Sequence, residues 1–120
     1  MKPSSAKAKA RRLQNAVAAL IRRRFGLAAR DVRPASMGAH GADVQLSADA
    51  AARFPFAVEC KNTERLNVWE ALAQAEANAD GLTPLLVFKR NRSRTYVVLE
   101  FEQFLELLEQ KVSEKQGKSK

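Results

Sequence analysis

The sequence predicts a single domain of the α/β or α+β class, in which helices flank a mixed β-sheet. Apolar residues recur at helical spacings near both ends of the chain, and strand-like apolar runs lie between them. Glycine and proline separate these segments. With 120 residues and 46% hydrophobic side chains, the chain is long enough for one core and short for two.

The N-terminal third is predicted to be a helix, an extended segment and a loop. The helix covers about residues 6–24 and ends at Gly26, a typical residue for this position. Residues 1–6 are expected to form a mobile basic arm. Residues 27–33 are expected to be extended, and residues 35–41 to be a flexible loop. The apolar face of the helix consists of Leu13, Val17, Leu20, Ile21 and Phe25.

Two strands are predicted in the middle of the chain, near residues 42–46 and over residues 54–61. Residues 47–53 are expected to be a connecting turn. Side chains of the second strand alternate, so that Glu59 and Lys61 share one face. The opposite face consists of Phe54, Phe56, Val58 and Cys60.

The C-terminal half is predicted to contain a helix, two strands and a closing helix. The first helix spans about residues 68–79, and Asn67 is a favourable N-cap for it. A buried strand is expected at residues 85–88 and another strand at residues 95–99. The closing helix begins near Phe101.

The charge balance predicts a polyanion as the partner. Lys and Arg number 21 against 13 Asp and Glu, which gives a net charge of +8. Nucleic acid is the first expectation and an anionic membrane surface the second. A spanning segment of about 20 apolar residues and a secretory signal are both missing from the sequence, which predicts a cytoplasmic protein. The single cysteine excludes an intramolecular disulfide. Residues 113–120 are expected to be a polar tail.

The pattern with most chemical content is Asp43 followed by Glu59 and Lys61. If the strand after Asp43 pairs antiparallel with the next strand, both carboxylates and the lysine converge. Two carboxylates suit Mg²⁺, and a lysine can orient or deprotonate water or neutralise a phosphate. The alternative is that Glu59 and Lys61 form an ordinary solvated charged face.

The order of three short motifs resembles that of the PD-(D/E)xK nuclease superfamily. The motifs are G-A-D-V at residues 41–44, V-E-C-K at residues 58–61, and Gln74 on the next helix. The sequence is most similar to the small archaeal-type and phage Holliday junction resolvases. This resemblance implies a restriction-endonuclease-like αβββαβ core and a homodimer that acts on branched double-stranded DNA.

The resemblance also implies a metal site for Mg²⁺, with Mn²⁺ as a substitute. Asp43, Glu59 and the backbone carbonyl of Cys60 would be the ligands, and Lys61 would be catalytic. The superfamily often has a glutamate on its first helix, whereas the nearest polar residue here is Gln14. Its amide oxygen would contribute in the outer shell, without charge.

Several further residues are candidates with ordinary alternatives. Ser36 and His40 lie in the loop before Asp43, where either could contact a phosphate or be a plain loop residue. Gln74 is a catalytic candidate or an exposed helix glutamine. The thiol of Cys60 is expected to be buried and structural, and Trp69 to lie in the core or at a dimer interface. The residues predicted to contact DNA are Arg11, Arg12, Arg33, His40, Lys89, Arg90, Arg92 and Arg94.

The function predicted from these features is Mg²⁺-dependent cleavage of four-way junctions by paired phosphodiester hydrolysis, in phage-type recombination or repair. One alternative is a nuclease of the same fold that acts on other repair, replication or restriction substrates. Another is a non-catalytic, basic nucleic-acid-binding protein. The acidic pair argues against the last, because carboxylates in a DNA-facing cleft repel phosphates unless a cation bridges them.

Overall fold

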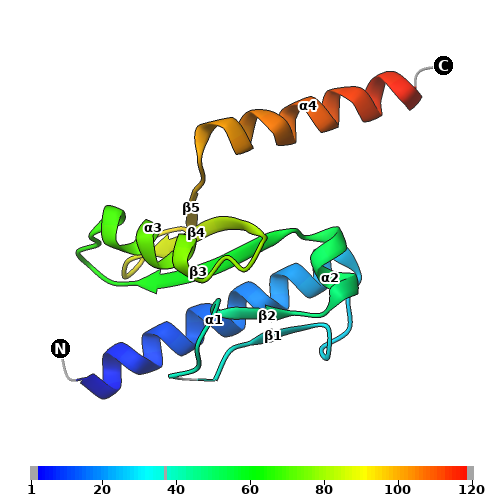
Figure 1. Ribbon diagram of the computed structural model, residues 1–120. Helices are drawn as coiled ribbons and strands as arrows, with labels where there is room; N and C mark the ends of the chain where they lie inside the picture. Colours follow the sequence, from blue (N-terminus) through cyan, green and yellow to red (C-terminus); the bar gives the residue numbers. More distant parts are fainter. Residues whose placement is uncertain (1–2, 37, 119–120) are drawn as a thin grey trace.

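The computed structural model describes residues 3–36 and 38–118, and its fold is of the predicted mixed α/β class (Figure 1). Four helices and five strands follow one another along these residues. In chain order they are α1 Pro3–Phe25, β1 Val32–Pro34, β2 Val44–Leu46, α2 Ala48–Arg53, β3 Phe56–Asn62, α3 Val68–Ala77, β4 Thr83–Lys89, β5 Tyr96–Val98 and α4 Phe101–Lys118.

The strands form two sheets that a single residue joins. β3 and β4 pair in parallel, β5 pairs antiparallel with β4, and β1 pairs antiparallel with β2. The backbone N–H of Asp43 donates to the carbonyl of Val58 at 2.8 Å and connects the two sheets. The ladder partner of β2 is therefore β1, and the predicted antiparallel pairing of β2 with the strand of Glu59 is wrong.

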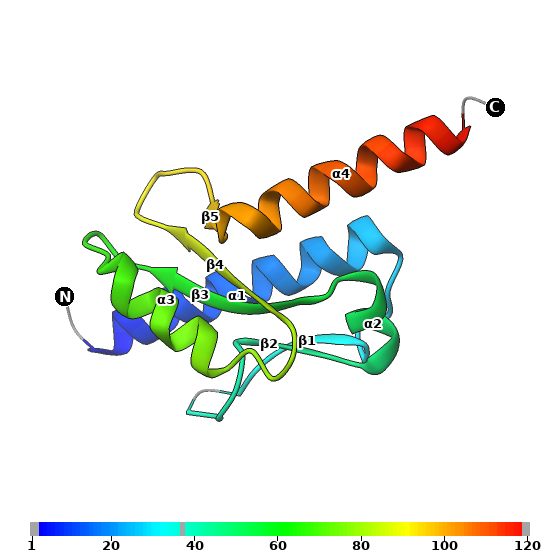
Figure 2. The same cartoon turned by 45° about the horizontal axis from the view of Figure 1, so that its top comes forward.

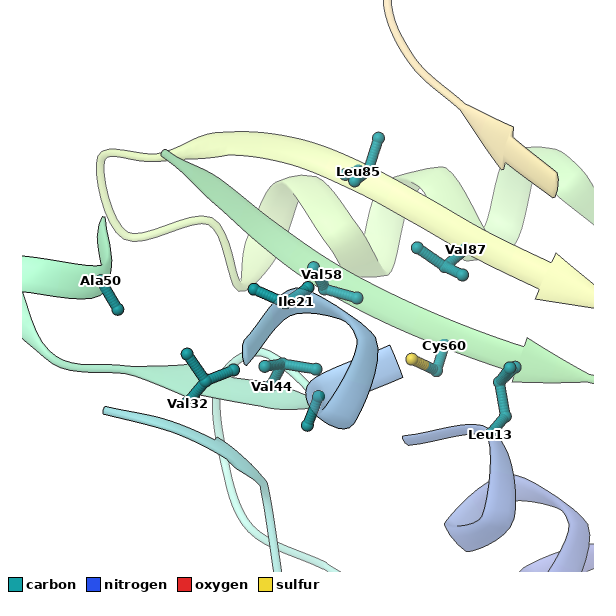
Figure 3. Close-up of a cluster of buried hydrophobic side chains, with 10 residues drawn as sticks. Leu13, Ile21, Val32, Val44, Ala50, Val58, Cys60, Leu85 and Val87 are labelled. Carbon is teal, nitrogen blue, oxygen red and sulfur yellow. The ribbon is translucent and has the colours of Figure 1, made fainter. Parts of the chain in front are cut away.

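α1 and α3 lie on opposite faces of β3 and β4 (Figure 2). Val58 and Cys60 of β3 point towards α1, where Leu13 and Ile21 meet them in the main apolar cluster (Figure 3). Successive side chains of a strand point to opposite faces, so Glu59 and Lys61 point towards α3. The small buried residues of α3 let this helix lie close to the sheet. These residues are Ala71 and Ala75.

The helices predicted near both ends of the chain are shorter than the helices in the structure. α1 begins at Pro3 rather than near residue 6, and α4 continues through the expected polar tail to Lys118. Alanine, lysine, glutamate and glutamine in these segments are good helix formers, and proline is tolerated in a first turn. The remaining residues of the predicted arm and tail, 1–2 and 119–120, lie outside the described residues.

The turn predicted at residues 47–53 is instead the short helix α2. The Ser47 side chain caps this helix by accepting a hydrogen bond from the Ala50 backbone N–H at 3.1 Å. The predicted end of α1 and the predicted start of α3 are confirmed, whereas α3 ends at Ala77 rather than near residue 79. Gly26 follows α1 with φ at 63°, and Asn67 caps α3 by accepting from the Glu70 N–H at 3.1 Å.

α4 projects away from the rest of the protein (Figure 1). With α4 included, the described residues extend over 58 × 30 × 28 Å along the principal axes. Most of its apolar side chains remain exposed, and so does Trp69 at 82%. Trp69 is therefore not a core residue. Within residues 3–36 and 38–118, the helices are too short or too polar to span a membrane.

Candidate active site

Asp43 is held against β3 by bonds on both sides of Glu59. Its backbone N–H donates to the Val58 carbonyl, and its Oδ2 accepts from the Cys60 backbone N–H at 2.7 Å. Its own carbonyl accepts from the Ala35 N–H at 2.8 Å. The first two bonds fix the Asp43 carboxylate relative to β3, so that no full β2–β3 ladder is needed to bring the two acids together.

Glu59 lies in the middle of β3 and is only 7% exposed. Its Oε2 is 3.7 Å from the Nζ of Lys61, two residues further on the same face. The side chain of Asn78, at the C-terminus of α3, lies close enough to Glu59 to stabilise its charged form. The structure thus brings Asp43, Glu59 and Lys61 together, with Glu59 and Lys61 on the α3 face of the sheet.

The two acids are held in a setting that disfavours their charged forms. Burial raises the pKa of Asp43, although the bond from the Cys60 N–H and the charge of Lys61 oppose this effect. Burial also raises the pKa of Glu59, and the negative charge of Asp43 raises it further. Lys61 and Asn78 act in the opposite direction. One lysine does not compensate for two partly buried carboxylates, so the pair favours an additional cation.

The donor set fits a hard divalent cation such as Mg²⁺, which binds through one or two carboxylates and water. Within a strand, the N–H and C=O of one residue point to the same side. Because the Cys60 N–H points to Asp43, the Cys60 carbonyl also faces that acid. Among the described residues, no group of three or more His, Cys, Asp or Glu side chains could hold a metal. A cation here would therefore rely on Asp43, Glu59, this carbonyl and water.

Gln74 lies on α3 in the same hollow as Lys61. The hollow has a volume of about 220 Å³, and its lining also includes Arg65, Asn67 and Glu70. The structure thus brings Gln74 next to the catalytic lysine candidate, while its role stays a prediction.

The loop candidates are exposed and lie before Asp43. His40 lines a second hollow of about 250 Å³ together with Ala57 and Asn78, beside the acidic pair. Ser36 is exposed, and its carbonyl accepts from the Ala39 N–H at 3.0 Å. Met37, which follows Ser36, lies outside the described residues.

Gln14 and Cys60 belong to the α1 side of the sheet. Gln14 is 8% exposed on the sheet-facing side of α1, whereas Glu59 points towards α3. An outer-shell role for Gln14 stays a prediction. Cys60 is buried as predicted, and burial together with the charges of Asp43 and Glu59 raises the pKa of its thiol. Its thiol is therefore a poor nucleophile at neutral pH.

Two basic segments that are distant in sequence meet at the end of β3 that follows Lys61. The Asn62 amide donates to the Lys9 carbonyl at 3.3 Å, which brings the N-terminal half of α1 there. The Thr63 N–H donates to the Lys89 carbonyl at 3.1 Å, and the Asn91 N–H to Glu64 at 2.7 Å. These bonds anchor the turn after β4 beside the candidate site.

Most of the residues predicted to contact DNA have exposed side chains. Arg33 lies apart from the two basic segments, on β1, and Lys89 is half-buried. The exposed ones are Arg11, Arg12, Arg33, His40, Arg90, Arg92 and Arg94.

Asn78 and Arg65 are two site residues that the sequence patterns did not predict. Asn78 follows Gln74 by four residues, which puts both side chains on the same side of α3. Helical spacing from Gln74 is therefore the signal that could have revealed it. Arg65 lies in the irregular segment between β3 and α3, and no periodicity points to it.

Comparison with protein families gives one match that covers nearly the whole chain. A family model described as "Phage putative PDDEXK endonuclease" matches residues 5–119. No curated protein and no solved structure matches the chain. The matched range contains every site residue discussed above.

Proposed function

The chain belongs to the phage PDDEXK endonuclease family, and from this premise we propose that it is a Mg²⁺-dependent endonuclease that cuts branched DNA, four-way junctions first. The observation that carries this proposal is the position of Asp43. Its two bonds to β3 hold its carboxylate beside Glu59, and Lys61 lies 3.7 Å from Glu59. A protein that only binds phosphates has no use for two partly buried acids at this place.

Asp43, Glu59 and the Cys60 carbonyl would hold the cation, and Mn²⁺ would substitute for Mg²⁺. When bound, such an ion lowers the pKa of water and neutralises charge that develops on the phosphate. The acids supply negative charge at fixed positions, and the bond from the Cys60 N–H keeps the Asp43 carboxylate from turning away.

Lys61 is the group that would position the attacking water. The Lys61 side chain lies on the same face as Glu59, and it lines the same hollow as Gln74. From there it can orient the water or neutralise the scissile phosphate. Hydrolysis forms one bond between the water oxygen and phosphorus and breaks one bond from phosphorus to a sugar oxygen, which takes a proton.

The basic segments support a substrate that is recognised by shape. Arginines from α1 and from the turn after β4 flank the end of β3, where they can contact phosphates from two directions. Phosphate contacts fix position without reading bases. Two such sites in a homodimer would place paired cuts on a two-fold junction.

Cleavage assays with labelled DNA test the proposal. A four-way junction, a flap and a linear duplex of equal length are incubated with the full chain and Mg²⁺. We expect nicking of the junction, and we expect Asp43→Asn and Glu59→Gln to abolish cleavage while junction binding persists. Asp49→Asn removes an exposed acid on α2 and should leave cleavage unchanged.

Each other outcome has a definite meaning. Full cleavage by Asp43→Asn would refute the assigned site. Equal cleavage of the flap or linear duplex would support nuclease activity but refute the preference for junctions. Binding without cleavage by the unmodified protein would favour a non-catalytic role.

A further inference from the structure

The face of the protein that α4 presents is strongly apolar and uncovered. Five side chains of α4 recur at spacings of three and four residues, which places them along one side of the helix. Each is between 38% and 69% exposed. We call them the α4 stripe, which consists of Phe101, Phe104, Leu105, Leu108 and Val112.

Among residues 3–36 and 38–118, no other segment covers the α4 stripe. α4 follows β5 after two residues and projects away from the sheet (Figure 1). At its base lies an apolar groove of about 750 Å³ between α3 and the first turn of α4. Trp69 lines this groove from α3, and Leu99 lines it from the end of β5. Trp69 is 82% exposed. From α4 the groove is lined by Gln103, on the side of the helix away from the α4 stripe, so the groove and the stripe are two separate open surfaces.

We propose that two copies of the chain join through these two surfaces, with the α4 stripe of each copy packed against the Trp69 groove of the other. Monomeric proteins rarely expose apolar patches above a few hundred Å². At roughly 200 Å² per aromatic side chain, the exposed parts of Trp69, Phe101 and Phe104 alone provide about 400 Å². A standard stable interface takes about 800 Å² from each partner, and the leucines and Val112 add to the aromatic part.

A second copy is the occupant that a surface of this kind favours. Both the protruding helix and the open groove are present on the same chain. In a two-fold dimer, the helix of each copy can therefore cover the groove of the other copy. The α4 helix also carries acidic residues away from the stripe, and these would remain solvated. Three of them are Glu102, Glu106 and Glu109.

The interface leaves the candidate active site open. α3 presents Trp69, Leu72 and Glu76 to the apolar groove and presents Gln74 to the hollow of Lys61. The helix thus separates the two regions, and a dimer formed on one flank keeps both catalytic hollows accessible. The use of this dimer for paired cuts rests on the proposed function, whereas the interface itself does not.

The experiment measures the mass of the full chain in solution by sedimentation or light scattering at micromolar concentration. We expect twice the 13.3 kDa of one chain. Leu108→Glu should weaken the dimer at least tenfold, because it buries a charge in the α4 stripe. Gln110→Glu adds the same charge on the other side of α4 and should leave the dimer intact. Circular dichroism checks that both variants keep their helices.

A second measurement needs no variant. Trp69 is the only tryptophan of the chain, so its fluorescence reports on the groove alone. Dilution of the unmodified protein should shift its emission to longer wavelength as the dimer dissociates. A monomer at micromolar concentration, a dimer that tolerates Leu108→Glu, or an emission maximum independent of concentration would each overturn the proposal. None of these results depends on nuclease activity.

Discussion

Glu59 and Asp43 are acids whose charged forms are disfavoured by burial in the folded protein. Both acids have a pKa above the ordinary value, chiefly because they are buried, and Glu59 also because Asp43 is near. In the absence of metal, the folded protein therefore holds protons that the unfolded chain has already lost. The stability of the metal-free protein should fall as the pH rises from about 4 through the raised pKa values, and stay lower above them.

This sign leads to a prediction for Glu59→Gln. In the metal-free protein at pH 7, the variant should melt a few degrees higher, equivalent to about 1 kcal/mol, because a partly buried charge is removed. At a pH below 4 the difference should vanish, since Glu59 is then protonated in both states. Differential scanning calorimetry at both pH values, with the exposed Glu102→Gln as control, measures this. A lower melting temperature of Glu59→Gln at neutral pH would contradict the account.

Lys9 is a second buried charge, and it has no evident catalytic use. The residue is 6% exposed on α1, and its Nζ finds no hydrogen-bond partner among the described residues. Lys9→Met keeps the apolar stem and removes the charge, so it should stabilise the protein by about 1 kcal/mol. Urea unfolding measures the change, and Lys7→Met at an exposed position serves as control. Destabilisation by Lys9→Met alone would show that the ammonium has a partner.

At the scale of elements, the sequence predicted what local patterns determine. Apolar spacing predicted α1 and α3. Gly26 predicted the end of α1, and the Asn67 cap predicted the start of α3. Strand alternation placed Glu59 and Lys61 on one face. The helix α2 was missed because its six residues contain little periodicity, and its main signal is the cap at Ser47.

The association of the strands was not predictable from such patterns. Which strand pairs with which depends on contacts between distant segments, and a ladder between the strand of Glu59 and the preceding strand was one of several possible pairings. The structure instead uses the Asp43 backbone and side chain as the link. The two acids therefore meet through the bonds of Asp43 to β3 and not through a β2–β3 ladder.

The turn after β4 is the element that we expect to contribute most to DNA affinity. It is anchored next to the site through Asn91 and Glu64, and it carries Arg90, Arg92 and Arg94. Replacing one of these arginines by alanine should weaken binding similarly for all sequences and lower the slope of log K against log salt by about 1. Fluorescence anisotropy at several salt concentrations checks this. An unchanged slope for all three variants would remove the turn from the interface.

For the whole molecule, the fold explains how a net charge of +8 coexists with an acidic pair. Basic residues of α1 and of the β4–β5 turn converge on one end of β3, while the acids lie on one face of that strand. Acids of α4 lie on a separate helix that projects away. Charge composition predicted a polyanion partner, but only the fold puts the two basic segments and the acids in one place.

The central claim is that Asp43 and Glu59 share one divalent cation. Calorimetric titration of the DNA-free protein with Mn²⁺ tests it most directly, because it involves neither substrate nor catalysis. The account predicts one ion per chain in the unmodified protein and an affinity at least about tenfold lower in both Asp43→Asn and Glu59→Gln. Binding of equal strength in the unmodified protein and both variants would contradict it.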